Sequence, residues 1–213
     1  MDPITEVRKR PTQERSRQRV QKILEISATR ITEVGADQLK MSDIAKLAEV
    51  PIGSVYQYFP NKSSIIRSLA EEHLQKLRKI LIDGLMGIKV SSSANELEQL
   101  HAMTDTIIDT YYHFYRYEPA FHSLWGGLQA DAMLNDLEVQ DTKESADILY
   151  EIIKPVMGSK YNESYLHTFS LLVCTQIGAT LRFAIQLPEN KGNEFVTVFK
   201  DQLKRIAVSL YNT

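Results

Sequence analysis

The polar side chains best suited to binding chemistry are concentrated between Ser42 and Lys62. They include hydroxyl, phenol, amide and ammonium groups, which donate hydrogen bonds to phosphate oxygens or to the edges of bases. A glutamine amide can bond an adenine edge at two points, and an aliphatic side chain can lie against a thymine methyl group. The candidate nucleic-acid contacts are Ser42, Ile52, Gly53, Ser54, Tyr56, Gln57, Tyr58 and Lys62.

Two short helices joined by a tight turn are needed to present these groups. Ile44 and Ala48 lie four residues apart, which places them on one face of a first short helix. Pro51 disfavours the helical conformation at Val50, so this helix must end before the proline. A second short helix is then expected from about Ile52 to Tyr58.

The second helix has one side for packing and another side for contact. Val55 and Phe59 are four residues apart and are expected to pack inward, which leaves the candidate contacts to point elsewhere. A helix-turn-helix that exposes its second helix in this way can place it in the major groove of DNA. Packing against a neighbouring helix is the alternative for the two tyrosines, Tyr56 and Tyr58.

The motif in register is Ile44-Ala45-x-x-Ala48-x-Val50-x-x-Gly53-x-Val55-Tyr56-x-Tyr58-Phe59-x-x-Lys62. It resembles the DNA-binding signature of the tetracycline-repressor (TetR) family of transcriptional regulators. The resemblance extends from Arg15 to about Leu69, roughly a quarter of the chain. It implies that the Tyr56 hydroxyl reaches a phosphate and that Lys62, at the start of the next helix, meets the same DNA strand.

Three features depart from the family pattern. Glu49 stands where a glycine usually makes the turn, and a left-handed backbone there would cost about 1–2 kcal/mol. Pro51 replaces the usual serine-type cap, so the cap hydrogen bond is lost. Lys40 and Met41 replace hydroxyl residues that are common before the first short helix. These departures leave the operator sequence unpredictable.

The surrounding sequence predicts an all-α protein. A long helix from Thr12 to Val34, ended by Gly35, is expected to support the helix-turn-helix and complete a three-helix head. The head spans residues 1–61, with a basic arm at about 1–11 that follows DNA or hangs free, and the larger helical body spans residues 62–213. The body helices are expected at about 62–85, 96–117, 131–157, 163–186 and 194–211, with a short helix after Pro119.

The charge distribution agrees with this division. Residues 1–80 carry 15 Lys and Arg against 10 Asp and Glu, a net charge of +5, and the remaining residues have a net charge of −7. A basic N-terminal part beside an acidic remainder is typical of a DNA-reading head on a body that DNA does not touch. A chance imbalance of solvated charges would give the same numbers, so the motif decides between the two interpretations.

Composition excludes several classes of protein. Cys174 is the only cysteine, which excludes an internal disulfide and a cysteine-based zinc site. The five histidines show no metal-ligand spacing, and no catalytic constellation is recognisable, so we expect no metal, no cofactor and no enzyme activity. No apolar run approaches the roughly 18 residues of a membrane span, and no signal-peptide core is present, so a cytoplasmic location is expected.

The resemblance also implies a small-molecule pocket in the body, and the aromatic cluster between Tyr111 and Trp125 is the feature that supports it. Aromatic walls with a few polar groups are common in ligand sites, although an ordinary aromatic core would have the same composition. Asp105 and Asp109, one helical turn apart, would favour a cationic ligand if they face inward. The candidate ligand contacts are Asp109, Tyr111, Tyr112, Tyr115, Phe121, Trp125, Tyr150, Phe169 and Gln176.

The last two long helices are candidates for a dimer interface. Apolar or small side chains occupy most of the circumference of the helix expected at 163–186, so it must be buried on more than one side. The family arrangement pairs two such helices from each subunit in a four-helix bundle, and closure of the subunit's own core is the alternative. The candidate interface residues are Cys174, Gly178, Leu181, Arg182, Ile185, Phe195, Phe199 and Ile206.

The expected function is therefore sequence-specific regulation of transcription. A homodimeric repressor would bind a near-palindromic operator in double-stranded DNA and leave it when a small-molecule effector binds the body. A DNA-binding module without an effector, an activator, and an enzyme that keeps the head as a relic are the alternatives.

Overall fold

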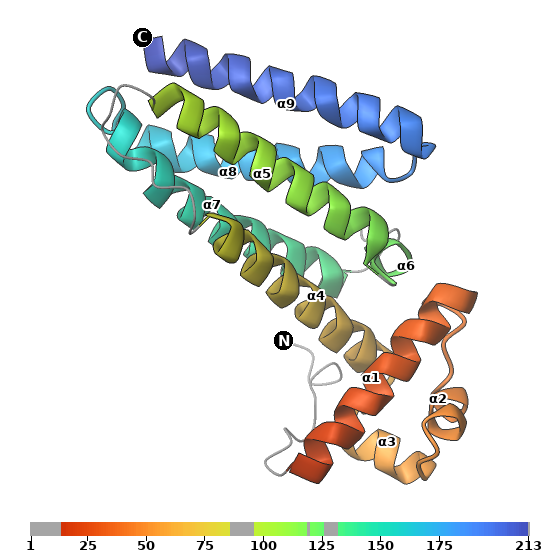
Figure 1. Ribbon diagram of the computed structural model, residues 1–213. Helices are drawn as coiled ribbons and strands as arrows, with labels where there is room; N and C mark the ends of the chain where they lie inside the picture. The colour runs from red at the N-terminus through yellow and green to blue at the C-terminus, as the bar shows by residue number, and fades with distance from the viewer. Residues whose placement is uncertain (1–13, 86–95, 119, 126–131, 213) are drawn as a thin grey trace. The chain divides into compact units, whose positions relative to one another are not determined.

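The structure, a computed structural model, describes residues 14–85, 96–118, 120–125 and 132–212, and its regular secondary structure there is entirely helical (Figure 1). This confirms the all-α prediction. The basic arm lies outside these residues, as does the chain between the helices predicted at 62–85 and 96–117. The helices are α1 (Glu14–Val34), α2 (Met41–Leu47), α3 (Ile52–Tyr58), α4 (Lys62–Leu85), α5 (Glu96–Tyr117), α6 (Phe121–Trp125), α7 (Ala132–Met157), α8 (Glu163–Ala184) and α9 (Glu189–Asn212).

The helices form two compact units. The first unit comprises Met1–Leu74 and Glu118–Leu137, and the second comprises Gln75–Tyr117 and Glu138–Thr213. Helices α4 and α7 therefore each contribute residues to both units. The functional division into a head and a body after residue 61 stays a prediction.

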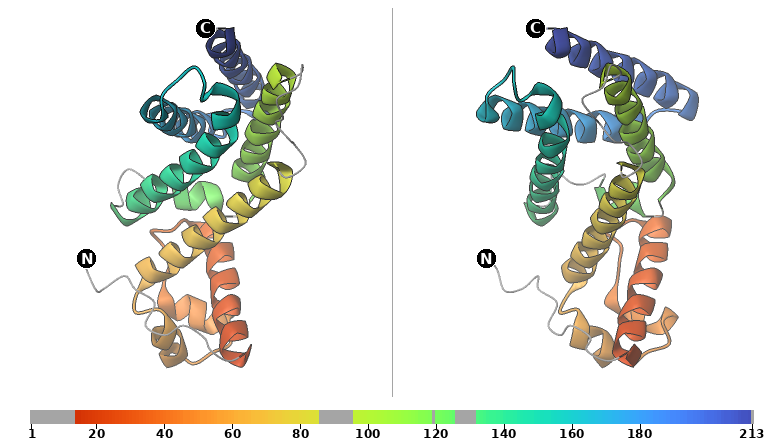
Figure 2. Two further views of the ribbon diagram at one scale, coloured as in Figure 1. Left: turned by 90° about the vertical axis from the view of Figure 1, so that its left-hand side faces the viewer. Right: turned by 60° about the vertical axis from the view of Figure 1, so that its left-hand side comes forward.

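In the first unit, α2 and α3 pack beside α1 (Figure 2). Helix α1 turns four buried side chains inward at helical spacing: Ile23, Leu24, Ser27 and Ile31. Helix α2 buries Ile44 and Ala45, and α3 buries Val55 and Tyr58. Burial of each large aliphatic side chain contributes about 1.5–3 kcal/mol, so this small core is what fixes α3 in place.

Local signals in the sequence set the ends of the head helices. Gly35 has a φ of 82°, and its N–H donates to the Ile31 carbonyl at 2.8 Å, so it ends α1 as predicted. Glu49 has a φ of 57°, which is the strained left-handed conformation foreseen for the helix-turn-helix turn. Pro51 precedes α3 without a side-chain cap. The Asn61 side chain caps α4 by accepting from the Ser64 N–H at 2.9 Å.

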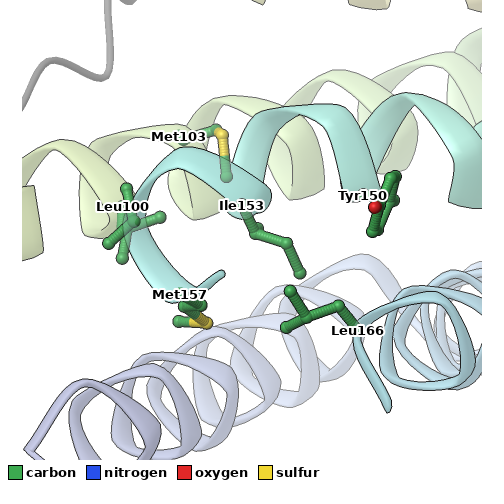
Figure 3. Packing of buried hydrophobic residues seen from close by; sticks show 7 residues of the cluster. Leu100, Met103, Tyr150, Ile153, Met157 and Leu166 are labelled. Carbon is green, nitrogen blue, oxygen red and sulfur yellow. The ribbon is translucent and has the colours of Figure 1, made fainter. Parts of the chain in front are cut away.

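In the second unit, α9 runs beside α5, and α8 packs on both (Figure 1). A buried cluster at one end of this unit joins side chains of α5, α7 and α8: Leu100, Met103, Tyr150, Ile153, Val156, Met157 and Leu166. Figure 3 shows Ile153 of α7 and Leu166 of α8 pointing toward one another. The Asn162 side chain caps α8 by accepting from the Tyr165 N–H at 2.9 Å.

Helix α9 begins at Glu189, five residues before the expected start, so the predicted loop at 188–193 is wrong. The reason lies at Gly192, which sits in the first turns of α9. A Cβ atom at this position would lie 2.5 Å from the Tyr112 hydroxyl, 2.6 Å from Arg116 Nη2 and 2.7 Å from the Ala184 carbonyl oxygen. The glycine therefore permits a close approach between helices rather than a loop. Helix α8 ends at Ala184, two residues early.

Candidate functional site

The exposed face of α3 carries the polar and apolar groups expected to meet DNA. Ile52 and Tyr56 are each 44% exposed and lie one helical turn apart. Gly53 and Gln57 are exposed beside them, and Ser54 is half-buried. The buried residues of α3 lie on the opposite side of the helix, so this face is not used for packing within the described part of the first unit.

Tyr58 does not belong to that face. It is only 3% exposed, so the prediction that it points outward with the other candidate contacts is wrong. It follows the fully buried Val55 by three residues, so both side chains lie on the core side of α3. Packing within the head is the role that the structure assigns to this tyrosine.

Ser42 and Lys62 flank α3 from the neighbouring helices. Ser42 is exposed in the first turn of α2, and its hydroxyl lies 3.5 Å from the Asp43 carboxylate. The Lys62 ammonium donates to the Asp37 carbonyl oxygen at 2.9 Å, so it ties the start of α4 to the loop between α1 and α2. An ammonium carries three donors, which leaves this group with donors beyond that contact.

The second unit contains a partly buried charged site that sequence analysis missed. Arg78 of α4 donates through Nη2 to the Asp141 carboxylate of α7 at 2.6 Å, and its Nη1 pairs with Glu144 of the same helix. The side chain of Asp141 is 15% exposed. Burial raises the pKa of Asp141 above its ordinary value even though the Arg78 guanidinium opposes that shift.

A second ion pair lies between α7 and α8. Arg182 pairs through Nη2 with Glu138, and both side chains are less than one quarter exposed. Arg182 also interacts with the hydroxyl of Tyr115, a buried residue of α5. Burial raises the pKa of Tyr115 strongly, and Asp141 and Glu138 add to that rise. The ion pair is formed within one subunit, so a pairing across a dimer interface is not needed to explain Arg182.

Tyr111 completes this arrangement from the next turn of α5. Its hydroxyl forms a hydrogen bond with Ser145 of α7, and its ring centroid lies 6.0 Å from that of Tyr115. Burial raises its pKa strongly. Burial also raises the pKa of the Cys174 thiol of α8 to about 12, so this thiol is protonated and unreactive at neutral pH. Two predicted ligand contacts, Tyr111 and Tyr115, thus share one interior site.

Asp109 does not share that site. Its carboxylate bonds the Lys200 ammonium of α9 at 2.9 and 3.0 Å, and its side chain is 60% exposed. Asp105 likewise accepts from Lys204 at 2.6 Å. The condition under which these carboxylates would favour a cationic ligand is therefore not met, because lysines on the adjacent helix α9 hold them at the surface between α5 and α9. The choice of Asp109 as a ligand contact is not supported.

The remaining predicted ligand contacts are dispersed. The Tyr112 hydroxyl accepts from Arg116 Nε at 3.0 Å near the α8–α9 turn, and Gln176 is half-buried on α8. Tyr150 belongs to the buried cluster of α5, α7 and α8, against which Phe169 packs, and its ring stacks on His167 at 3.7 Å. Phe121 and Trp125 belong to the first unit, with ring centroids 5.8 Å apart.

The predicted dimer residues fall into two groups. Leu181 is fully buried and Phe199 is 7% exposed within the subunit, so neither presents a surface to a partner. Phe195 is 40% exposed, and Cys174, Gly178, Arg182, Ile185 and Ile206 are half-buried. The largest exposed apolar side chains of α8 and α9 also include three that were not predicted: Leu172 at 55%, Phe183 at 50% and Val198 at 64%.

Two kinds of feature are absent from the described ranges. No group of His, Cys, Asp or Glu side chains there is arranged to hold a metal ion. Among the helices of that part of the chain, none is long and apolar enough to cross a membrane.

The charged site was not recognised from the sequence because its acidic residues are not distinguishable there from exposed ones. Glu138, Asp141 and Glu144 are spaced at three residues along α7, but the same helix carries other acidic residues that are exposed. The informative residue was Arg182, an arginine in a largely apolar helix that the sequence assigned to the dimer interface.

Comparison with known proteins gives two family matches. Residues 98–206 match the model described as "Tetracyclin repressor-like, C-terminal domain", and residues 23–69 match the model described as "Bacterial regulatory proteins, tetR family". No curated protein matches the sequence.

Several solved structures have the same fold. A TetR-family transcriptional regulator from Streptomyces coelicolor is 23% identical, with a TM-score of 0.63, over 91% of this chain and 97% of that one. One from Pectobacterium atrosepticum is 13% identical, with a TM-score of 0.68, over 94% and 97%. A fatty acid degradation regulator from Bacillus halodurans is 18% identical, with a TM-score of 0.54, over 95% of both chains. At these identities the likeness shows the fold alone.

Proposed function

Because the chain belongs to the tetracycline-repressor (TetR) family of bacterial transcriptional regulators, we propose that it is a homodimeric repressor that an effector removes from DNA. Its operator is near-palindromic, and the effector is a small molecule bound in the second unit. The observation that carries the proposal is the exposed face of α3, where Ile52, Tyr56 and Gln57 project from a helix whose other side is anchored in the head.

The chemistry of that face supports both positioning and reading of DNA. The Tyr56 hydroxyl and the Lys62 ammonium are donors for phosphate oxygens, which orient the protein without reading sequence. Gln57 can bond an adenine edge, and Ile52 can lie against a thymine methyl group. Arg15, Arg17 and Arg19 are exposed at the start of α1 and add positive charge to the same unit.

A dimer supplies the second recognition helix. The apolar side chains exposed on α8 and α9, which include Leu172, Phe183, Phe195 and Val198, form the surface that we assign to the partner. Two copies of α3 about 34–36 Å apart would meet successive faces of the major groove, which matches a near-palindromic site. An effector releases the DNA by binding better to a body conformation that disturbs this spacing.

The test of DNA recognition is selection of genomic fragments by the purified protein at moderate and high salt. A short near-palindrome retained at high salt is the expected result. Tyr56→Phe combined with Lys62→Ala should weaken binding to that sequence at least about tenfold, because two phosphate contacts are lost. Tyr58→Phe, on the buried side of α3, is the matched control and should bind normally. Unchanged affinity in the double variant would refute the proposed DNA face.

The test of the dimer is sedimentation velocity. Leu172→Glu combined with Phe183→Glu should give a monomer with weak operator binding, because two charges would be buried in the interface. Val139→Glu is the matched control, since Val139 is a 44% exposed apolar residue of α7 outside the assigned surface. A double variant that remains dimeric would place the interface elsewhere.

A further inference from the structure

We propose that the effector is an organic cation that binds beside Tyr111, Tyr115 and Asp141, and that it competes with Arg78 for the Asp141 carboxylate. This inference rests on the proposed function, because it names the chemical class of the effector and the contact through which the effector acts. Four observations in the second unit carry it.

The first observation is an excess of negative charge on one face of α7. Glu138, Asp141 and Glu144 recur at intervals of three residues, so they lie along one side of the helix. The three carboxylates face two guanidinium groups, those of Arg78 and Arg182. Among these five groups the carboxylates outnumber the guanidinium groups by one, and because Asp141 is only 15% exposed a further positive charge beside it is favoured.

The second observation is the behaviour of the groups around Asp141. Burial raises the pKa of Asp141 in spite of its bond to Arg78, and the neighbouring Glu144 adds to that rise. The Asp141 charge in turn helps to raise the pKa of Tyr111, Tyr115 and Cys174. The electron-rich faces of the two tyrosine rings are suited to a cation as well.

The third observation is an unused hydrogen-bonding group at Ser170 of α8. Thr168 and Thr175 of the same helix bond the backbone carbonyls four residues earlier, at 2.9 and 2.8 Å. The Ser170 hydroxyl makes no such bond, is fully buried, and has no hydrogen-bond partner in the part of the chain that the structure describes. It therefore points away from its own helix backbone and into the interior.

The position of Ser170 connects it to the charged site. Ser170 lies one helical turn before Cys174, so the two side chains share a face of α8. Cys174 is close enough to Asp141 and Tyr111 to affect the pKa of the tyrosine and to be affected by the carboxylate. A buried hydroxyl without a partner is unfavourable, and an ammonium N–H of a ligand would supply the missing donor.

The fourth observation explains how occupancy would be transmitted. Arg78 of α4 bonds α7 through Asp141 and Glu144. Its Nε is buried without a partner among the described residues, so the guanidinium is held only through its terminal nitrogens. A cation bound at Asp141 weakens this hold on α4, the helix that begins beside α3 with Lys62. By linkage, Arg78 weakens the binding of the cation by the same factor.

The experiment uses pairs of ligands that share an apolar skeleton and differ in charge. Phenylalkyl and alkyl amines are titrated by calorimetry into the full-length protein, beside the carboxylates of the same skeletons. We expect the amines to bind and the matched carboxylates to bind at least about tenfold more weakly. Preference for the carboxylates, equal binding of both, or no binding of any amine in the panel would overturn the proposed ligand class.

Variants test the two named contacts in opposite directions. Asp141→Asn should weaken amine binding at least about tenfold, because it removes the charge partner. Arg78→Gln should strengthen amine binding by about tenfold, because it removes the competitor. Arg78→Lys, which keeps the charge, should lie between Arg78→Gln and the wild type and serves if the glutamine variant unfolds. Asp109→Asn is the matched control, since it also breaks a carboxylate pair in the second unit, and should bind as the wild type does.

A separate readout distinguishes this inference from the proposed function. Release of the selected operator is followed by fluorescence anisotropy with each ligand. Amines that bind through Asp141 without releasing DNA would contradict the proposed regulation while leaving the cation site in place. DNA released by carboxylates alone would support regulation by an effector and overturn the cation site. If Asp141→Asn and Arg78→Gln changed amine affinity in the same direction, the proposed competition with Arg78 would be overturned.

Discussion

Replacement of Gly192 by alanine should destabilise the protein, although alanine is the better helix former. The helical preference alone would favour alanine by about 1 kcal/mol. The added Cβ, however, would lie 2.7 Å from the Ala184 carbonyl oxygen, a backbone atom that cannot rotate away, and 2.6 Å from Arg116 Nη2. Arg116 would have to give up its bonds to the carbonyl oxygens of Ala184 and Leu187, at 3.1 and 3.3 Å.

The magnitude follows from these opposing effects. Overpacking of a tight site costs about 1–3 kcal/mol, and loss of the charged hydrogen bonds costs about 1.5–3 kcal/mol. After the gain in helical preference, the net loss in the free energy of unfolding is about 3 kcal/mol. For a chain of this size, that corresponds to a melting temperature lower by about 6–12 °C.

The assay is thermal and urea unfolding followed by circular dichroism, at one protein concentration because any self-association would make stability depend on concentration. Gly53→Ala is the matched control. Gly53 is also a helical glycine, but a Cβ there meets nothing within 4 Å, so alanine should stabilise the protein by about 0.5–1 kcal/mol. The reasoning would be refuted if both variants shifted stability in the same direction.

Two further predictions concern Glu49 and Asp141. Glu49→Gly should raise the free energy of unfolding by about 1 kcal/mol in urea titration, because Glu49 has a φ of 57°, which glycine adopts without strain. The ion pair that is lost, with Lys22 at 3.7 Å, is exposed and contributes little. An unchanged or lower free energy of unfolding would show that the turn is not strained. Burial raises the pKa of Asp141 in the folded state, so the folded protein binds a proton more readily than the unfolded chain and this carboxyl opposes folding increasingly as the pH rises through the raised pKa. Relative to Asp141→Asn, the wild type should therefore gain stability as the pH falls from 7 toward 4, and the opposite trend in paired unfolding curves would contradict the shift.

Local signals made much of the fold predictable. Gly35 at the end of α1 and Pro51 before α3 each act within a few residues, and the helices end or begin there as the sequence predicted. The Asn162 cap of α8 is equally local. Gly192 failed as a signal because its role depends on Tyr112, Arg116 and Ala184, which are distant in sequence or belong to another helix. A glycine required for a close approach cannot be told from a loop glycine by its neighbours in sequence.

The interior site was less predictable for a similar reason. Tyr111 and Tyr115 were found because aromatic residues cluster in the sequence. Asp109 was predicted to be a ligand contact and Asp141 was not, although both are carboxylates on long helices. What separates them is the partner of each, Lys200 for Asp109 and Arg78 for Asp141, and these partners lie 91 and 63 residues away in the chain.

Helix α3 divides its residues between two independent tasks, and this division bears on how the protein can evolve. Val55 and Tyr58 hold the helix in the head, whereas Ile52, Tyr56 and Gln57 face outward. Substitutions at such outward positions usually change stability by less than about 0.5 kcal/mol. Under the proposed function, a duplicated copy of the gene could therefore acquire preference for a new DNA sequence by a few point mutations while its fold remains above the stability threshold that selection enforces.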